Sequence, residues 1–165
     1  MLIITNLIKK DSPLFNDFFA SLEGFNYSLW FEVKNFWYDG DDCFNLDNLK
    51  IIFPEAQDES SENFLFLKDN EFFEDLSKYF CFIPDEKGDV LLSDNQTIIA
   101  TRLQLFIKAI ESLINIPILK ATIYQFHPSG DYLDPSGSYW NFCFIVLNKD
   151  EKKGIAITAS ALCTE

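Results

Sequence analysis

The residues best suited to chemistry lie in one stretch, residues 127–140, which reads HPSGDYLDPSGSYW. It contains His127, the only histidine of the chain, together with Ser129 or Ser136 as possible nucleophiles and Asp131 or Asp134 as possible orienting acids. These residue types could form a serine–histidine–aspartate triad. However, the G-x-S-x-G elbow is missing, and residues this close along one loop rarely converge in triad geometry. We therefore expect no triad here.

The four cysteines also give little indication of a catalytic or metal-binding site. Cys43, Cys81, Cys143 and Cys163 are widely spaced and form no C-x-x-C pair. A dyad of Cys143 with His127 is conceivable, but Cys143 lies inside an apolar segment, which favours a buried structural thiol. With one histidine, a zinc site would have to be assembled from distant strands. We expect reduced thiols, no metal and no cofactor.

Other motifs also fail to indicate an enzyme. The stretch DGDDCFNLDN, residues 39–48, is similar to a calcium loop, but Cys43 stands at its fifth position and the closing glutamate is absent. The chain has no Walker A sequence, no G-x-G-x-x-G and no H-E-x-x-H. Carboxylates are too abundant to mark a catalytic pair. We therefore predict a protein that is not an enzyme.

The charge of the chain is uneven. The net charge is −13, and all of it lies within residues 1–100, because residues 101–165 contain equal numbers of acidic and basic side chains. Phosphate backbones are bound by lysine and arginine, so direct binding of nucleic acid is disfavoured. A cationic protein partner would be attracted instead. The plainer alternative is that the acidity only confers solubility.

Length and composition indicate one globular domain over residues 1–165. The chain is 48% hydrophobic and has 18 phenylalanines against one methionine, so its core is expected to rest on phenylalanine clusters. The N-terminus lacks the pattern of a signal peptide, and no apolar run is long enough to span a bilayer. We expect a cytoplasmic protein without a membrane segment.

The first half of the chain mixes helical and extended patterns. A short helix is expected from Ser12 and Pro13 to Gly24. Strict alternation predicts a strand over residues 25–33, with Trp30 on its polar side. A hairpin turn is expected at Asp39-Gly40. Residues 49–54 and 63–68 are predicted as strands, residues 69–80 as a second helix, and residues 81–92 as a strand pair.

The second half gives a clearer pattern. Ser93 and Gln96 have capping-box spacing, apolar residues follow at helical intervals from Ile99 to Ile114, and Pro117 ends this third helix. Residues 118–127, 139–148 and 154–163 are predicted as three strands. The predicted fold is α+β, a single domain with a mainly antiparallel sheet whose C-terminal three-stranded meander packs against about three helices.

The stretch from His127 onward then falls between the first two strands of the meander, as a loop of about a dozen residues. Its glycines and prolines are enough to explain reversals of direction. Long loops in compact domains are often functional, and Tyr132, Tyr139 and Trp140 are residue types that anchor interfaces. We predict a binding loop and not an active site.

An acidic single α+β domain with many aromatic residues and no chemical motif resembles the bacterial immunity proteins of contact-dependent growth inhibition and related toxin systems. The resemblance covers the general character of the whole chain. It implies an inhibitor that occludes the basic active site of a cognate toxin, a nuclease being the expected kind. The candidate contacts lie in three loops: Asp39, Asp41, Asp42, Asp58, Glu59, Glu62, Asp131, Tyr132, Asp134, Tyr139 and Trp140.

Two alternatives remain open from the sequence. One is a small enzyme that uses the loop of residues 127–140. The other is an acidic mimic of nucleic acid that binds DNA-binding proteins promiscuously and in a strongly salt-dependent way.

Overall fold

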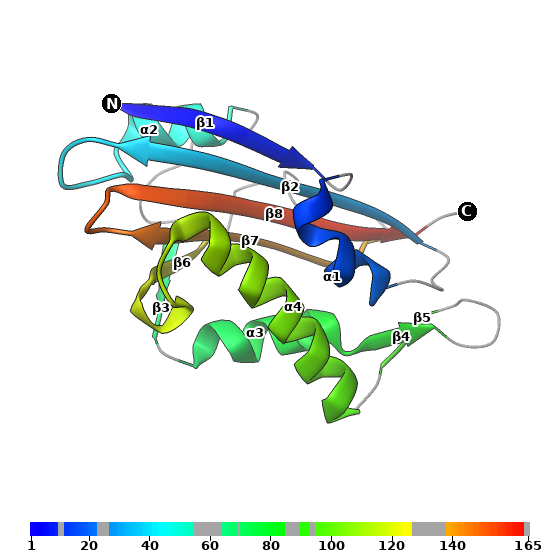
Figure 1. Cartoon of the computed structure of the whole chain (residues 1–165). Coiled ribbons are helices and arrows are strands. Elements are labelled where there is room, and N and C mark those ends of the chain that lie inside the picture. The colour runs from blue at the N-terminus through cyan, green and yellow to red at the C-terminus, as the bar shows by residue number, and fades with distance from the viewer. Residues whose placement is uncertain are drawn as a thin grey trace.

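A six-stranded antiparallel sheet forms the centre of the molecule (Figure 1). The computed structural model describes residues 1–9, 12–22, 27–54, 64–68, 70–84, 90–92, 95–126 and 138–163. The strands run in the order β1-β2-β8-β7-β6-β3, and β4 and β5 form a separate ribbon. Their bounds are β1 Leu2–Lys9, β2 Tyr27–Tyr38, β3 Phe64–Leu67, β4 Phe82–Pro84, β5 Val90–Leu92, β6 Thr122–Phe126, β7 Ser138–Asn148 and β8 Lys153–Cys163.

The helices divide between the two faces of the sheet. On one face, here called the helical face, lie the 3₁₀ turn η1 (Pro13–Phe15) and the helices α1 (Asn16–Ala20), α3 (Glu71–Phe80) and α4 (Gln96–Ile114). The opposite face, here called the α2 face, is packed by α2 (Leu46–Ile52). A second 3₁₀ turn, η3 (Ile118–Lys120), leads from α4 into β6. The sheet thus separates two apolar clusters.

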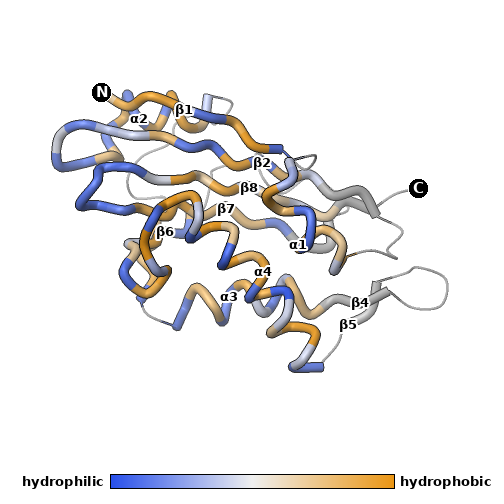
Figure 2. Tube along the Cα trace, viewed as in Figure 1, coloured by the Kyte–Doolittle hydropathy of each residue, from blue (hydrophilic) through white to orange (hydrophobic). Residues whose placement is uncertain are grey.

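Phenylalanine dominates both clusters, as the composition predicts. On the helical face, Phe18 lies 5.0 Å from Phe106 between ring centroids, and Phe72 meets Phe144 edge-on at 4.9 Å. Such tilted and edge-on arrangements suit the ring quadrupole. Along α4, apolar and polar residues alternate, which matches a helix with one face on the sheet (Figure 2). The fully buried phenylalanines are Phe15, Phe36, Phe53, Phe72, Phe80, Phe106 and Phe144.

Arg102 of α4 joins three helical segments beneath the surface. Its side chain is only 3% exposed. Nη1 donates to the carbonyl of Phe80 at 2.7 Å, and Nε and Nη2 donate to the carbonyl of Ser21 at 3.3 and 3.0 Å. These carbonyls belong to the ends of α3 and α1, where helices leave acceptors without partners. One guanidinium therefore fixes both helix ends against α4.

The predicted α+β class and the C-terminal meander are confirmed. Strands β6, β7 and β8 pair consecutively and antiparallel, and α4 packs against β7 and β8. The strand pair β4–β5, the strand β3 and the helix α3 also lie where the sequence predicts them. In β2, Phe31 and Val33 are buried whereas Trp30 is 41% exposed, as its alternation predicts.

Several local predictions are wrong. Residues 49–54 are not a strand, because α2 occupies Leu46–Ile52. The side chain of Asn45 accepts a hydrogen bond from the amide of Asn48 and starts this helix, while Leu49 and Ile52 face the core. The turn at Asp39-Gly40 exists, but it leads into α2 and not into a second hairpin strand.

The predicted helix starts also need correction. Asn95, and not Ser93, caps α4, and its side chain accepts from the amides of Thr97 and Ile98. The first helix is present but begins as the 3₁₀ turn η1 at Pro13, and α1 already ends at Ala20. Strand β1 was not predicted at all. It pairs with β2 at the edge of the sheet and contains a register shift between Ile4 and Asn6.

The first prediction concerns Arg102. Arg102→Leu leaves the buried carbonyl of Phe80 and the partly buried carbonyl of Ser21 without these donors, so we expect the free energy of unfolding to fall by about 3 kcal/mol. Urea denaturation followed by circular dichroism measures it. Gln104→Leu, an exposed position on the same helix, is the control and should change stability by less than about 0.5 kcal/mol. Equal stability of the two variants would contradict the role assigned to Arg102.

The second prediction concerns Gly154 at the start of β8. A Cβ atom there would lie 2.6 Å from Leu147 Cδ2, 2.9 Å from Phe36 Cζ and 2.9 Å from the carbonyl oxygen of Val146. The carbonyl belongs to the sheet backbone and cannot move aside, so Gly154→Ala should cost about 1–3 kcal/mol. Gly40→Ala is the comparison: a Cβ there meets nothing within 4 Å, and only the φ of +80° is unfavourable. It should cost about 1 kcal/mol.

Candidate partner-binding surfaces

The loop between β2 and α2 presents acidic side chains on a tight turn. Asp39, Asp41 and Asp42 are all exposed, as a binding role requires. Gly40 supplies the positive φ of +80° that the turn needs. Asp42 Oδ1 accepts a hydrogen bond from the amide of Phe44 at 2.8 Å, which closes the next turn. A local hydrogen bond thus holds the carboxylate of Asp42 in place.

Asp39 is partly neutralised within the chain. The N-terminal ammonium group of Met1 hydrogen-bonds its carboxylate, and the amide of Asp39 donates to the Met1 carbonyl at 3.0 Å. The bond from the N-terminal ammonium, with Lys152 nearby, lowers the pKa of Asp39 below its usual value. Asp41 and Asp47, the latter in the first turn of α2, have no cationic partner among the described residues. These carboxylates are available to a partner.

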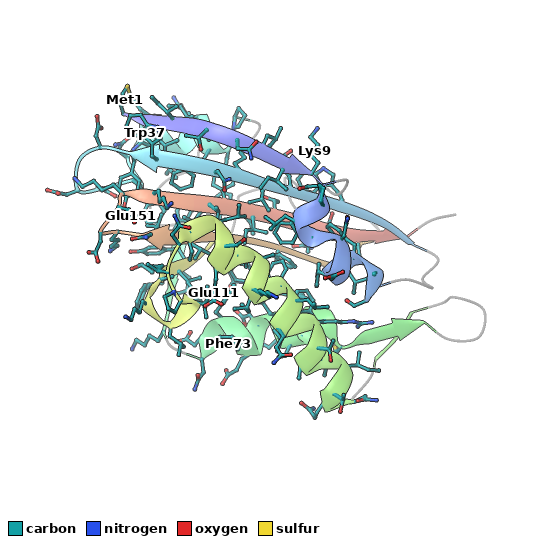
Figure 3. The ribbon with its side chains drawn as sticks, in the orientation of Figure 1. Met1, Lys9, Trp37, Phe73, Glu111 and Glu151 are labelled. Carbon is teal, nitrogen blue, oxygen red and sulfur yellow. The ribbon has the colours of Figure 1, made fainter. Side chains whose placement is uncertain are left out.

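Exposed apolar side chains accompany the acidic ones at this corner of the sheet. Met1 is 64% exposed and Leu46 is 53% exposed. Trp37 lies opposite Ile3 in the β1–β2 pair, and Met1 and Trp37 lie at the same end of the molecule (Figure 3). We call this region the acidic corner and define it by Asp39, Asp41, Asp42, Asp47, Met1, Trp37 and Leu46. Within it, Trp37 lies on the face of β2 opposite Phe36 and Tyr38, and therefore on the other side of the sheet from α2.

The other predicted contacts are not brought together with this corner by any described contact. Asp58, Glu59, Glu62, Asp131, Tyr132 and Asp134 lie outside the described residues, as do His127, Ser129 and Ser136. Tyr139 and Trp140 belong to β7, where the register shifts between Ser138 and Trp140 and Trp140 stands opposite Ala161. Their predicted role as anchors stays a prediction.

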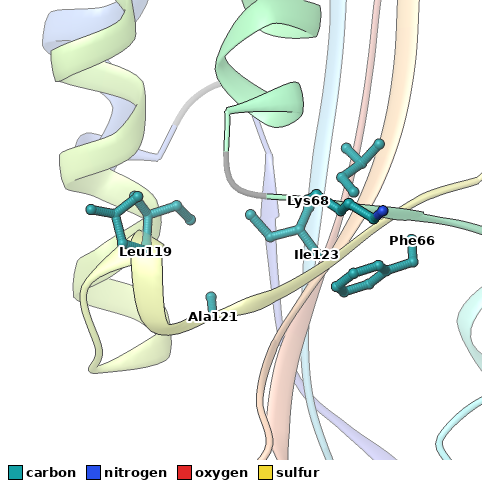
Figure 4. A pocket seen from close by; sticks show the side chains of 7 residues that line it. Phe66, Lys68, Leu119, Ala121 and Ile123 are labelled. Atoms are coloured by element: carbon teal, nitrogen blue, oxygen red, sulfur yellow. The ribbon is translucent and has the colours of Figure 1, made fainter.

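A second surface, which the sequence reasoning missed, lies at the far edge of the sheet. There a hollow of about 180 Å³ is lined by the residues that define the β3 groove: Phe66, Leu67, Lys68, Ile118, Leu119, Ala121 and Ile123. In Figure 4, Leu119 stands on one side of the hollow and Phe66 on the other, with Ala121 and Ile123 between them. The available signal was the strand FLFL, which carries apolar residues on both faces.

The described residues do not assemble a metal-binding centre, and burial suppresses ionisation of two of their thiols. No group of three or more histidine, cysteine, aspartate or glutamate side chains in this part of the chain could hold a metal ion. Burial raises the pKa of the Cys43 thiol to about 12, and nearby Asp42 adds to the effect. Burial also raises the pKa of Cys143 to about 12, although its thiol hydrogen-bonds with the Thr158 hydroxyl at 3.6 Å. Both thiols are protonated at neutral pH and are poor nucleophiles.

None of the helices in the described ranges has the length and apolar character needed to cross a membrane.

Comparison with known proteins shows a fold relationship only. No protein-family profile matches the chain, and neither does any curated protein sequence. Two crystal structures of citrus MAF1 are similar to it. One is 16% identical with a TM-score of 0.56 over 93% of this chain and 100% of that chain. The other is 14% identical with a TM-score of 0.57 over 92% and 99%. The α+β architecture therefore has a precedent in MAF1.

The third prediction tests the thiols. At pH 8, more than three units below their pKa values of about 12, Cys43 and Cys143 should resist iodoacetamide in the folded protein, because only the thiolate reacts. Mass spectrometry of digested protein measures the modification of each cysteine. Cys81, which is partly exposed, is the internal control, and unfolding in urea should make all described thiols reactive. Fast labelling of native Cys143 would revive the catalytic-thiol hypothesis.

Proposed function

We propose that this protein is a non-catalytic inhibitor that binds a cationic protein domain through the acidic corner, in the manner of a toxin-specific immunity protein. The observation that supports the proposal most directly is the turn at Asp39–Gly40, which presents exposed carboxylates in the chain between exposed Trp37 at the end of β2 and exposed Leu46 at the start of α2. Occlusion of a basic active site requires this combination of charge and apolar anchoring. It requires no chemistry from the inhibitor.

The local hydrogen bonds of the turn favour binding. An interface loses affinity when loops and side chains must be ordered on association. Here the Asp42 bond to the Phe44 amide and the Asn45 cap on α2 hold the loop before a partner arrives. The carboxylates of Asp41 and Asp47 can then meet lysine or arginine side chains with little rearrangement. The remaining negative charge of the chain would accelerate encounter with a cationic surface.

The apolar members of the acidic corner provide a reason for specificity. A pure charge mimic would bind many cationic proteins and release them as salt screens the charges. Trp37 and Leu46 add surface that contributes only against a partner of complementary shape. Binding to one partner should therefore persist at about 0.3 M salt, where the Debye length is shorter than at physiological salt.

The fourth prediction tests the acidic corner by charge reversal. Asp41→Lys with Asp47→Lys should weaken binding by about tenfold or more, mainly through slower association. The probe is the toxin domain encoded immediately upstream, because immunity genes follow their toxin genes. Biolayer interferometry measures the rates, and co-expression with the toxin domain measures the protection of growth.

The matched control is Asp17→Lys with Glu74→Lys. These residues are also exposed and lie in the first turns of α1 and α3, so the control has the same net charge and a similar loss of helix-terminal charge. It should bind and protect as the wild type does. Equal weakening in both pairs would show that only net charge matters and would favour the charge mimic. Failure of the wild-type protein to bind the upstream-encoded domain would overturn the proposed function.

A further inference from the structure

We propose that Lys152, in the turn between β7 and β8, is a specificity-determining residue of the acidic corner, and that its ammonium group binds a carboxylate of the cationic partner. The inference rests on the proposed function, because it names a second charge contact of the same interface. The partner must then present an acidic side chain among its basic ones. A partner that presents only positive charge would be disfavoured.

The backbone of Lys152 adopts an unusual conformation. Its φ is 51°, in the left-handed region. Among the described residues, the other non-glycine residue with a positive φ is Asn115, which ends α4, where asparagine is common in this conformation. At Lys152 the left-handed backbone crowds the Cβ atom, and glycine would avoid this. An outlier of this kind motivates a hypothesis about what the side chain does.

Two hydrogen bonds hold Lys152 beside the acidic corner. Its carbonyl accepts from the amide of Tyr38 at 3.0 Å, and its amide donates to the carbonyl of Lys149 at 3.3 Å. Tyr38 directly precedes Asp39, so the turn between β7 and β8 lies next to the loop that follows β2 (Figure 1). Both backbone polar groups of Lys152 are thus engaged, and its position relative to the acidic loop is fixed.

The start of the same turn is anchored by Asn148. Its Nδ2 donates to the carbonyl of Ile114 at 2.9 Å, and its Oδ1 accepts from the amide of Glu151 at 3.2 Å. The turn is therefore tied to α4 at one end and to β2 at the other. A contact made from such a turn requires little ordering when a partner binds.

The side chain of Lys152 is exposed and forms no ion pair with the described carboxylates. Its neighbour Lys153 does form one, with 3.3 Å between Nζ and the Oε2 atom of Glu151. The carboxylate of Asp39 is bound by the N-terminal ammonium of Met1. Lys152 acts on Asp39 only through space and helps to lower the pKa of that carboxyl. The ammonium group of Lys152 can therefore pair with a carboxylate from outside the chain.

The plainer role for Lys152 is to compensate the negative charge of the acidic loop. The two roles predict opposite effects when the ammonium group is removed. Loss of a compensating charge makes the acidic corner more negative and speeds association with a cationic partner. Loss of an ion-pair partner leaves the carboxylate of the bound protein unpaired and speeds dissociation.

The fifth prediction uses Lys152→Asn, because asparagine tolerates the left-handed conformation and carries no charge. The probe is again the toxin domain encoded immediately upstream. The variant should dissociate about fivefold faster in biolayer interferometry, as expected for the loss of one partly exposed ion pair. Lys152→Arg retains the charge and should bind as the wild type does. The control is Lys108→Gln, an exposed position on α4 with the same change in net charge, which should leave the dissociation rate unchanged.

Thermal unfolding separates recognition from stability. Lys152→Gly relieves the crowding of the Cβ atom, so its Tm should be about 2 °C higher than that of the wild type. It should nevertheless dissociate from the toxin domain as fast as Lys152→Asn does. A lower Tm in both variants together with weaker binding would assign Lys152 to the fold and overturn the inference.

A second probe tests the preference for a mixed-charge partner. Poly-L-lysine presents no acidic side chains, so Lys152→Asn should bind it at least as tightly as the wild type does. Equal weakening of binding to both probes would overturn the inference. If the wild type binds the toxin domain and Lys152→Asn binds it equally or more tightly, this inference alone fails. If the wild type does not bind the toxin domain, the proposed function fails and this inference fails with it.

Discussion

The arrangement of the helices depends on one buried side chain, Arg102. Its guanidinium group donates from the middle helix α4 to the carbonyls that end α1 and α3, so three segments distant in sequence share one donor group. Burying a guanidinium is costly unless its hydrogen bonds are made, and the planar fork suits two acceptors at once. Around this centre, Phe18, Phe80 and Phe106 pack ring against ring and exclude water from the bonds.

Because the central strands of the sheet are buried, the side chains accessible to a partner lie at its edges. Along β7, residues such as Phe144 on one face and Ile145 on the other are fully buried, and Ile157 in β8 is buried as well. Strands covered on both faces contribute stability but no accessible side chains. The acidic corner is built where β1, β2 and α2 meet, and the β3 groove lies at the other edge. One fold thereby carries two surfaces of different chemistry, separated by the width of the sheet.

The similarity to citrus MAF1 concerns the fold alone, so function has to be inferred from the surfaces of this protein. At 14–16% identity, the shared feature is the arrangement of the strands and helices. Function is carried by sites placed on a fold, so the case for a partner-binding protein rests on particular groups. Those groups are the carboxylates at the turn after β2 and the exposed apolar side chains of the acidic corner.

The sequence by itself determined the elements whose pattern is long and periodic. The apolar spacing from Ile99 to Ile114 is strong enough to specify α4, and the three apolar strands at the C-terminus pair with their neighbours in the chain. The exposed position of Asp39, Asp41 and Asp42 also followed from sequence, because clustered carboxylates cannot be buried without partners. These features depend on local composition and on contacts between segments adjacent in the chain.

Tertiary structure decided the rest, since short segments lack a pattern that fixes their conformation. The run LKII is compatible with a strand, and only the Asn45 cap and the packing of Leu49 and Ile52 on the sheet select the helix α2. Strand β1 finds its place through β2, about 30 residues later in the chain. The role of Arg102 and the shape of the β3 groove likewise arise from segments far apart in sequence. Long-range packing creates them, so no local pattern could contain them.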